Sequence, residues 1–376
     1  MARKPGQSAT RTAKCASSYA EAVASELLPW FRRHQRELPW RQSADPYRVW
    51  LSEIMLQQTQ VVTVIPYFER FVARFPTVTD LAQANEQDVL RLWEGLGYYR
   101  RARQLLAAAK VVASEHEGAF PNTLDGLQGL PGIGRYTAGA IASIAYDLPA
   151  PILEANTVRL LARLGAIAGD PTSADVQARL WKLAEDLLPH KRCGEFNQAL
   201  MELGSLVCTP REPKCGECPL RELCAAFQQG RQDELPTPKP KQVFESVREA
   251  AVIVEHCGRV YLRQCGAGER WAGLWDFARF AVSAKRGRAF QEELTSKVRE
   301  QAGLDVQRFE KLTTLKHGVT RFRITLDCYR AECTRPARLK PHSQWVKPTE
   351  LADMPLSTTG RKLARLLVAQ RVESRE

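Results

Sequence analysis

Four cysteines lie within residues 208–224, in the pattern Cys208-x6-Cys215-x2-Cys218-x5-Cys224. Four thiolates can hold either a zinc ion or an iron–sulfur cluster. Zinc sites usually pair two short Cys-x2-Cys-like knuckles, whereas this segment has one tight pair and no histidine. Irregular spacing suits a cubane cluster better, so we predict that the four cysteines bind a 4Fe-4S cluster, with zinc as the alternative.

A second pattern is the glycine-rich stretch LPGIGRYTA at residues 130–138, which opens a helix-periodic run. Glycines let the backbone turn tightly, and the free amides at a helix start can bind a DNA phosphate. By itself, a Gly-x-Gly pair favours an ordinary turn between helices. Because the cysteine loop lies in the same chain, we predict a DNA-binding hairpin that uses Gly132, Gly134, Arg135 and Thr137.

The chain up to about residue 227 is a series of expected helices that would position these two loops. Apolar residues recur at helical spacing, and alternating β-branched runs are few. The helices are expected at residues 47–57, 61–75, 102–115, 137–146, 157–164 and 195–207. With the stretch 124–129 before the glycines, the motif is helix, hairpin, helix. This half is therefore predicted to be all-α.

A proline-rich run, RQDELPTPKPKQ, separates this half from one with a different pattern. Alternate prolines favour an extended spacer. Beyond it, strands are expected at residues 250–255, 260–263 and 322–329, and helices at 288–302 and 359–368. The second half is thus predicted to be α+β. We expect a basic disordered tail (1–19), a helical domain (20–229), a linker (230–243) and an α+β domain (244–370).

The composition narrows the class of function. The 376 residues hold 54 Lys and Arg against 42 Asp and Glu, a formal net charge of +12, which favours a polyanionic partner such as nucleic acid. A hydrophobic content of 44% argues against a disordered chain, and no run approaches the roughly 18 apolar residues of a membrane span. The basic start lacks the apolar region of a secretory signal. A cytoplasmic, nucleoid-associated location is expected, with an organelle transit peptide as the alternative.

Several segments resemble the adenine DNA glycosylases of the MutY family, a branch of the helix-hairpin-helix glycosylases that also include endonuclease III. Besides the hairpin and the cysteine loop, they are LPWR (38–41), WLSEIMLQQTQ (50–60), GLGYY (95–99) and RWAGLWDF (270–277). The run LQQTQ is particularly specific, and the resemblance covers nearly the full chain. It implies a mostly α helix-hairpin-helix glycosylase fold with an iron–sulfur loop, followed by an α+β Nudix-like domain.

The resemblance also assigns two carboxylates. Removing a purine requires an acid that protonates the base and an anion that stabilises an oxocarbenium-like sugar. Glu53 matches the acid, and burial should raise its pKa. Glu154 stands where relatives usually carry Asp, with Asn156 as its hydrogen-bonding neighbour. The longer side chain, and Ala155 in place of the family's glycine, indicate a different backbone path in this loop.

Three further residues refine the expected activity. Tyr136 stands where endonuclease III relatives carry a lysine that forms a Schiff base and nicks the strand, so the chain resembles the monofunctional branch. Gln57 matches the residue that wedges into the base stack, and Tyr98 matches the one that intercalates beside the damaged guanine. We expect a monomer that excises adenine opposite 8-oxoguanine or guanine in duplex DNA. The alternatives are a non-catalytic iron–sulfur DNA-binding protein and an endonuclease III-like glycosylase/lyase.

The Nudix-like half lacks the carboxylates of a phosphohydrolase. The segment SKVREQAG (296–303) retains one of those that hold magnesium in a catalytic Nudix box, so a lesion-reading module is expected. Relatives often place Phe-Ser-His at a strand turn to sense 8-oxoguanine, and HGVTRF (317–322) is the matching stretch. Thr320 keeps the hydroxyl, whereas Val319 and Arg321 differ. Thr320 is therefore assigned to DNA binding, and the strength of 8-oxoguanine discrimination stays open.

Overall fold

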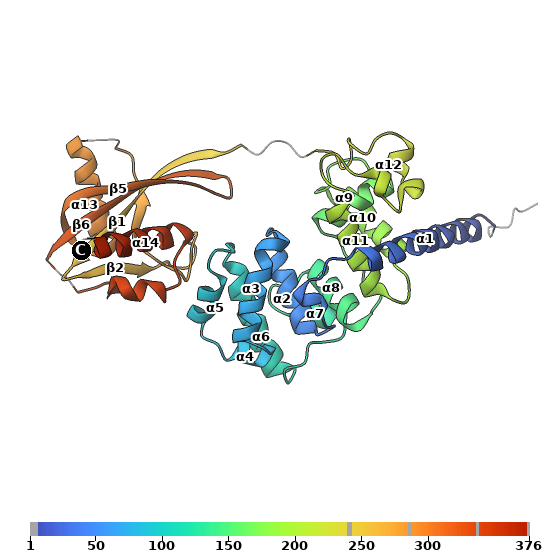
Figure 1. Ribbon diagram of the computed structural model, residues 1–376, viewed down its shortest axis with the longest axis horizontal. Helices are drawn as coiled ribbons and strands as arrows, with labels where there is room; N and C mark the ends of the chain where they lie inside the picture. The colour runs from blue at the N-terminus through green and yellow to red at the C-terminus, as the bar shows by residue number, and fades with distance from the viewer. Residues whose placement is uncertain (1–6, 239–242, 285–286, 336–337, 374–376) are drawn as a thin grey trace, which may run out of the picture. The chain divides into compact units, whose positions relative to one another are not determined.

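The computed structural model describes residues 7–238, 243–284, 287–335 and 338–373, and the chain forms two compact units (Figure 1). One comprises Met1–Gln83 and Gln104–Pro240, and the other comprises Ala84–Arg103 and Lys241–Glu376. The sequence led us to expect two contiguous domains. Residues 84–103 instead join the C-terminal unit, because their side chains bond to C-terminal residues, as Glu94 does to Arg361.

The part of the chain before the linker is helical, as expected. Its described helices are α1 (Gln7–His34), α2 (Pro46–Leu56), α3 (Val61–Arg74), α4 (Val78–Ala82), α5 (Glu86–Trp93), α6 (Arg100–Glu115), α7 (Leu124–Gly129), α8 (Arg135–Tyr146), α9 (Ala155–Leu164), α10 (Ala174–Leu187), α11 (Cys193–Leu206) and α12 (Ala225–Gln228). Short 3-10 turns lie at Pro39–Arg41, Cys215–Glu217 and Arg221–Leu223.

The start of α1 corrects one expectation. Residues 7–19 were expected to be part of a disordered tail, but they belong to this helix, and residues 1–6 lie outside the described residues. No proline or glycine interrupts the chain between Gln7 and Pro29, so the helix can continue outward from its anchored end. That anchor is the buried face with Val23, Leu27 and Trp30.

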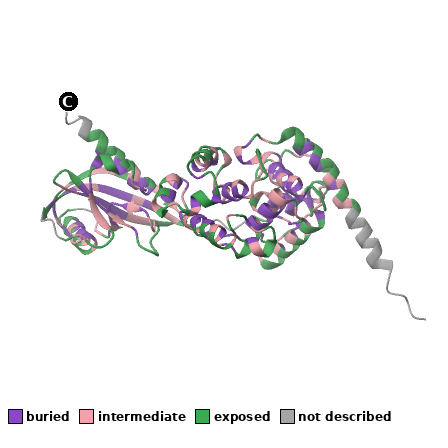
Figure 2. Ribbon diagram, turned by 90° about the horizontal axis from the view of Figure 1, so that it is seen from below, coloured by how far each residue is buried: buried purple, intermediate pink, exposed green. Residues whose placement is uncertain are grey.

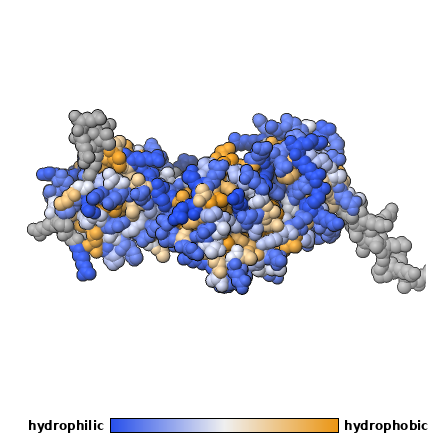
Figure 3. Space-filling view, turned by 60° about the horizontal axis from the view of Figure 1, so that its bottom comes forward, coloured by the Kyte–Doolittle hydropathy of each residue, from blue (hydrophilic) through white to orange (hydrophobic). Residues whose placement is uncertain are grey.

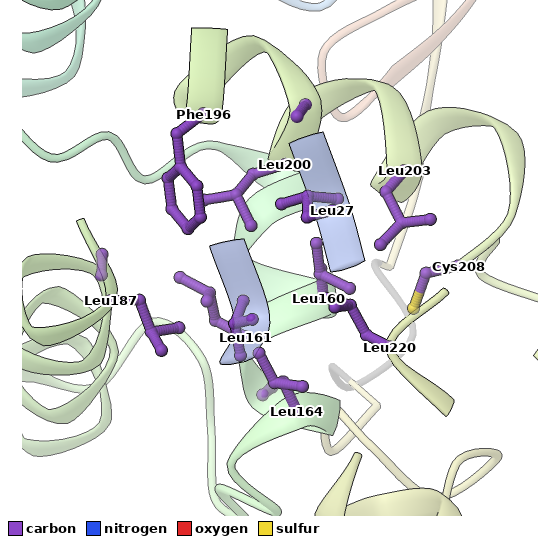
Figure 4. Close-up of a cluster of buried hydrophobic side chains, with 14 of the residues drawn as sticks. Leu27, Leu160, Leu161, Leu164, Leu187, Phe196, Leu200, Leu203, Cys208 and Leu220 are labelled. Carbon is purple, nitrogen blue, oxygen red and sulfur yellow. The ribbon is translucent and has the colours of Figure 1, made fainter. Parts of the chain in front are cut away.

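A leucine-rich core holds the helices around the cysteine loop in place (Figure 4). α1, α9 and α11 contribute side chains at helical spacing, which places them on one face of each helix. The labelled members are Leu27, Leu160, Leu161, Leu164, Leu187, Phe196, Leu200, Leu203, Cys208 and Leu220. Since Cys208 and Leu220 belong to the cysteine segment, this core fixes the loop to the helical scaffold.

The second unit contains a mixed sheet of strand order β3-β2-β1-β6-β5, with β4 paired to β1 and β7 paired to β2. The strands are β1 (Glu245–His256), β2 (Arg259–Gln264), β3 (Trp275–Asp276), β4 (Ala278–Ala281), β5 (Asp305–Val319), β6 (Phe322–Arg335) and β7 (Ser343–Val346). β1 and β6 are parallel and the other pairs are antiparallel. A 3-10 turn follows at Pro348–Ala352.

Two helices cover the two faces of this sheet. In the central strand β1, Val252 and Val254 face the cluster formed with α13 (Gly287–Ala302), while Ala251 and Ile253 face the cluster formed with α14 (Thr358–Glu373). Successive strand residues point to opposite faces, so a continuous apolar run is buried on both sides (Figure 2). The expected α+β class is therefore confirmed.

The surface of the described residues is mostly hydrophilic on the face displayed in Figure 3, with smaller hydrophobic patches between. Among the residues that the structure describes, none of the helices combines the length and the apolar character needed to cross a membrane.

Candidate active site and iron–sulfur loop

A cavity of about 430 Å³ in the helical unit brings together the residues predicted for catalysis. Its lining includes Glu53, Gln57, Tyr136, Glu154 and Asn156. They come from the end of α2, the first turn of α8 and the start of α9, and α2 packs directly against α8. The volume lies within the roughly 300–1,000 Å³ range of ligand pockets, so a nucleobase-sized group can enter.

Glu53 lies on a helix that is buried almost all round. Its neighbours Ser52 and Ile54 are both buried, and the residue itself is 6% exposed. Burial raises the pKa of Glu53 to about 7, against the opposing effect of the hydrogen bond from the Tyr136 hydroxyl to Glu53 Oε2. A carboxyl group with this pKa holds a proton on about half of the molecules near pH 7, so it can act as an acid.

Glu154 is the N-cap of α9, and its side chain folds back onto the helix start. Its Oε2 accepts a hydrogen bond from the Asn156 amide at 2.9 Å, and its Oε1 accepts one from the Thr157 amide at 2.9 Å. Burial raises the pKa of Glu154, while these two amides oppose the rise. The helix amides therefore fix the position of the carboxylate. Because the Glu154 side chain bends back to reach them, its additional methylene group is accommodated at the start of α9. Ala155 is the first helical residue, so its position does not require glycine.

Asn156 connects this carboxylate to the cysteine segment. Its Nδ2 donates to Glu154 Oε2 at 3.3 Å, and its Oδ1 accepts from Arg159 Nη2 at 2.9 Å. Arg159 Nε in turn donates to the backbone oxygen of Cys208 at 2.6 Å. A continuous chain of hydrogen bonds thus runs from the N-cap of α9 to the first cysteine.

The hairpin has the predicted backbone, with one restriction. Gly132 has a φ of +76°, and a Cβ there would lie 2.8 Å from Gln104, so only glycine fits. Gly134 is the N-cap of α8, which leaves the first helix amides free for an anion. Arg135 is exposed, and its guanidinium carbon lies 3.8 Å from the centroid of the Trp181 ring. Thr137 is 3% exposed, so its side chain is not available to DNA in this structure.

Tyr98 and Thr320 belong to the second unit and do not line this cavity. Tyr98 is exposed with a φ of +48°. Thr320 has a φ of +52° in the turn between β5 and β6, and its hydroxyl donates to the Val319 oxygen at 2.7 Å. Both side chains are therefore on surfaces that a large partner can reach.

The four cysteines of the loop face one space. They line one small cavity together with Leu160, Leu220 and Phe227. Tetrahedral zinc needs every sulfur at about 2.3 Å from one point, whereas the irons of a cubane each take one thiolate. The cavity is thus consistent with the predicted cluster.

Replacing one of these ligands gives the first prediction. We expect Cys218→Ser to lower the iron content well below that of a loaded cluster, which is about four atoms per chain, because one iron loses its thiolate. The visible absorbance of the cluster should fall with the iron content. DNA affinity should fall as well, since the exposed Arg211, Lys214 and Arg221 lie on the same loop. Cys257→Ser, at an exposed turn, is the control. One zinc and no iron in the parent protein would contradict the assignment.

Three charged residues of the cavity, Glu202, Arg36 and Arg41, were not predicted from the sequence. Glu202 on α11 is 1% exposed and receives hydrogen bonds from Arg36 Nε at 2.8 Å and Arg41 Nη2 at 2.8 Å. Burial raises the pKa of Glu202, but the two arginines outweigh it and hold the pKa at about 2. A single carboxylate within the apolar run ALMELGSL was the available signal. The three residues give one wall of the cavity fixed charges.

This cluster should carry a measurable part of the stability. We expect Glu202→Gln to lower the free energy of unfolding by about 3 kcal/mol, because two partly buried cations lose their buried anion. The folded pKa lies below the unfolded value near 4, so this contribution is present above pH 4 and is lost as the pH falls towards about 2. Denaturant unfolding between pH 7 and 2 measures both effects. Asp186→Asn removes an exposed ion pair with Lys182 and should have little effect.

The helix α13, which contains most of the segment compared with the Nudix box, carries ion pairs on its surface. On α13, Lys297 pairs with Glu300 at 3.4 Å, and Arg299 pairs with Asp305 at 2.6 Å. Glu300 is therefore engaged with a cation of its own helix. This arrangement is in line with the expected loss of phosphohydrolase chemistry, which stays a prediction.

Three models of known protein families match parts of the chain. Residues 51–186 match the model of the HhH-GPD superfamily base excision DNA repair proteins, residues 249–366 match the NUDIX domain, and residues 208–224 match the iron–sulfur binding domain of endonuclease III. The chain is 39% identical over 260 residues to the adenine DNA glycosylase of Buchnera aphidicola (Schizaphis graminum), covering 69% of this chain and 75% of that protein. The chain belongs to the adenine DNA glycosylase family. The predicted family, fold and iron–sulfur cofactor are thereby confirmed.

Other relatives extend the likeness to animals. The mouse adenine DNA glycosylase is 42% identical over 295 residues, covering 75% of this chain and 55% of the mouse protein. The chain thus spans about half the length of this relative. A solved thermostable thymine-DNA glycosylase is 29% identical with a TM-score of 0.52, covering 56% of this chain and 98% of that one. The helical unit of the present chain therefore has the fold of a DNA glycosylase.

Proposed function

We propose that this chain excises adenine from duplex DNA where it is mispaired with 8-oxoguanine or guanine. The observation that carries the proposal is the cavity in which Glu53, with a pKa of about 7, is hydrogen-bonded to Tyr136 and faces the same space as Glu154. One group there can give a proton, and the other can stabilise a cation. The names of the family's curated members support adenine as the base.

The steps follow from the positions of the side chains. Adenine leaves the base stack and enters the cavity, and Gln57, which lines this cavity, fills the vacated place. Glu53 protonates the base at N7, which weakens the glycosidic bond. Glu154 stabilises the positive charge that develops on the sugar, and Glu53 then activates the water that attacks it. The ion pair of Arg41 and Glu202 makes one wall of the cavity polar.

The reaction ends at the abasic site. Tyr136 occupies the first turn of α8 with its hydroxyl directed to Glu53, and a phenol cannot form the Schiff base that a lysine would form. Strand cleavage is therefore excluded from the proposed activity. The 4Fe-4S cluster, when bound, supplies structural support by cross-linking the loop that carries Arg211, Lys214 and Arg221.

The proposed partner is double-stranded DNA, bound by a monomer in the cytoplasm with the nucleoid. The net charge of +12 and the hairpin amides support phosphate binding. The β5–β6 turn with Thr320 is proposed to read the base opposite adenine, as a module without hydrolase activity.

A single-turnover assay tests the activity. The substrate is a duplex with adenine opposite 8-oxoguanine, and the products are separated with and without alkali. We expect strand breaks only in the samples that are treated with alkali after the enzyme reaction. A duplex with adenine opposite thymine should give no breaks. Breaks without alkali would favour the glycosylase/lyase alternative. Tight binding without any excision would favour the non-catalytic alternative.

A further inference from the structure

Tyr98 combines a left-handed backbone with an exposed ring. Its φ is +48°, and the residue is 51% exposed. Bulky residues rarely adopt this backbone region, and they keep it only where the surrounding structure determines it. Exposed aromatic rings stack on bases in nucleic-acid complexes. In a chain that acts on DNA, the position of this ring therefore has to be maintained.

The inner side of the Tyr98 loop (residues 94–99) is held by Arg101 and Trp93. Arg101 Nη2 donates to the backbone oxygens of Leu96 and Gly97 at 3.3 Å each. Its guanidinium lies 5.4 Å from the Trp93 ring centroid and 5.6 Å from that of Tyr98. Trp93 Nε1 adds a hydrogen bond to the Gly97 oxygen at 3.1 Å. These contacts determine the shape of the loop but not where it is attached.

The attachment comes from the C-terminal end of the chain. Arg361 on α14 donates to Glu94 through Nε at 2.6 Å and through Nη2 at 2.9 Å. The two side chains are only 13% and 9% exposed, and the Leu356 amide also donates to Glu94 Oε2 at 3.2 Å. Arg361 is itself fixed by the backbone oxygens of Leu351 and Met354 at 2.5 Å each. A bidentate ion pair that is mostly buried fixes the orientation of the two side chains relative to each other.

A second link lies at the other end of α5. Trp275 Nε1 donates to Gln87 Oε1 at 2.9 Å, and Gln87 Nε2 donates to the Gly273 oxygen at 3.1 Å. Beyond the loop, Arg103 donates to the Ala272 oxygen. The segment that carries Tyr98 is thus tied to the C-terminal sheet region before, at and after the loop.

We propose that Arg361 is a positioning residue for Tyr98. Through its pair with Glu94, it fixes the Tyr98 loop to the unit that carries the β5–β6 turn, so that one body sets both the aromatic ring and the turn against the DNA. Arg361 itself does not touch DNA in this account. The inference rests on the proposed function for its choice of DNA substrate.

The test uses the full chain with its iron–sulfur cluster and a duplex with 8-oxoguanine opposite a non-cleavable 2′-fluoro-adenosine. A 2-aminopurine beside the 8-oxoguanine reports stacking by its fluorescence. We expect Arg361→Gln and Glu94→Gln each to reduce the fluorescence change at saturating protein and to weaken binding by about tenfold. The double variant should be no worse than the stronger single one, because both remove the same link.

The decisive comparison measures Arg361→Gln in a protein that also carries Tyr98→Ala. If Arg361 acts through Tyr98, Arg361→Gln adds no further loss of fluorescence change or affinity once the ring is gone. An equal additional loss in that background would overturn the proposal, because Arg361 would then act on stability in general. Arg299→Gln is the matched control, since it breaks an exposed ion pair with Asp305 in the same unit and should leave both readouts unchanged.

Two further arms keep the result interpretable. If Arg361→Gln does not fold, Arg361→Lys keeps the charge but loses the two-point contact, and it is measured in the same way with and without Tyr98. Adenine excision by the parent protein is measured separately on a cleavable duplex. A parent that binds but does not excise would refute the proposed function, while the fluorescence and affinity still decide the role of Arg361.

Discussion

Glu53→Gln is expected to abolish adenine excision, with a single-turnover rate lower by about 10²–10⁴-fold. Gln keeps the size and polarity of the side chain but cannot supply a proton. Binding to a duplex with adenine opposite 8-oxoguanine should stay within about tenfold of the parent protein, because the cavity keeps its shape. Single-turnover rates and equilibrium binding on the same duplex measure the two effects. Substantial turnover by this variant would remove Glu53 from the acid role.

The pH dependence of the parent protein provides an independent check on Glu53. Burial raises its pKa to about 7, so the protonated fraction falls about fiftyfold between pH 7 and pH 9, and the rate should fall with it. On the acid side the rate should fall as Glu154 becomes protonated, because its pKa is raised by burial. Arg299→Gln should leave this profile unchanged. A rate that is flat from pH 7 to pH 9 would contradict a proton donor with this pKa.

Glu154→Gln is expected to be the other nearly inactive variant. The sugar would lose the anion that stabilises its positive charge, at a cost on the order of 10²–10³-fold in rate. Gln can still accept hydrogen bonds from the Asn156 and Thr157 amides through its oxygen, so α9 should stay capped. Single-turnover kinetics and thermal unfolding separate the loss of charge from a loss of the cap.

Glu154→Asp distinguishes between two explanations for the longer side chain. The carboxylate is fixed by the amides at the start of α9, and Asp is a common N-cap that reaches the same amides. We therefore expect Asp to keep the rate within about tenfold of the parent, in spite of the missing carbon. A loss of more than about 10²-fold would show that the longer stem is needed to reach the sugar. Unchanged rates for both Gln and Asp would show that another carboxylate carries the charge.

Local patterns were sufficient for most of the helices. The periodic runs predicted at 47–57 and 157–164 correspond to α2 at Pro46–Leu56 and α9 at Ala155–Leu164. β5 was not predicted, and its sequence explains why. Val306, Phe309, Leu312 and Leu315 recur every three residues, which is closer to a helical period than to a strand. Register shifts at three places along the β5–β6 pairing absorb this spacing, so the partner strand decides the conformation.

The sequence by itself determined which chemical groups are present. The cysteine spacing, the glycine hairpin and Glu53 within an apolar run each depend on neighbours a few residues away, so their meaning was readable without a fold. Only the tertiary structure decided how they act. The pKa of Glu53 depends on burial by distant helices, the reach of Glu154 depends on where α9 begins, and the state of Glu202 depends on Arg36 and Arg41, more than 160 residues earlier. The attachment of the Tyr98 loop to Arg361 is likewise a contact between segments far apart in the chain, which no local pattern encodes.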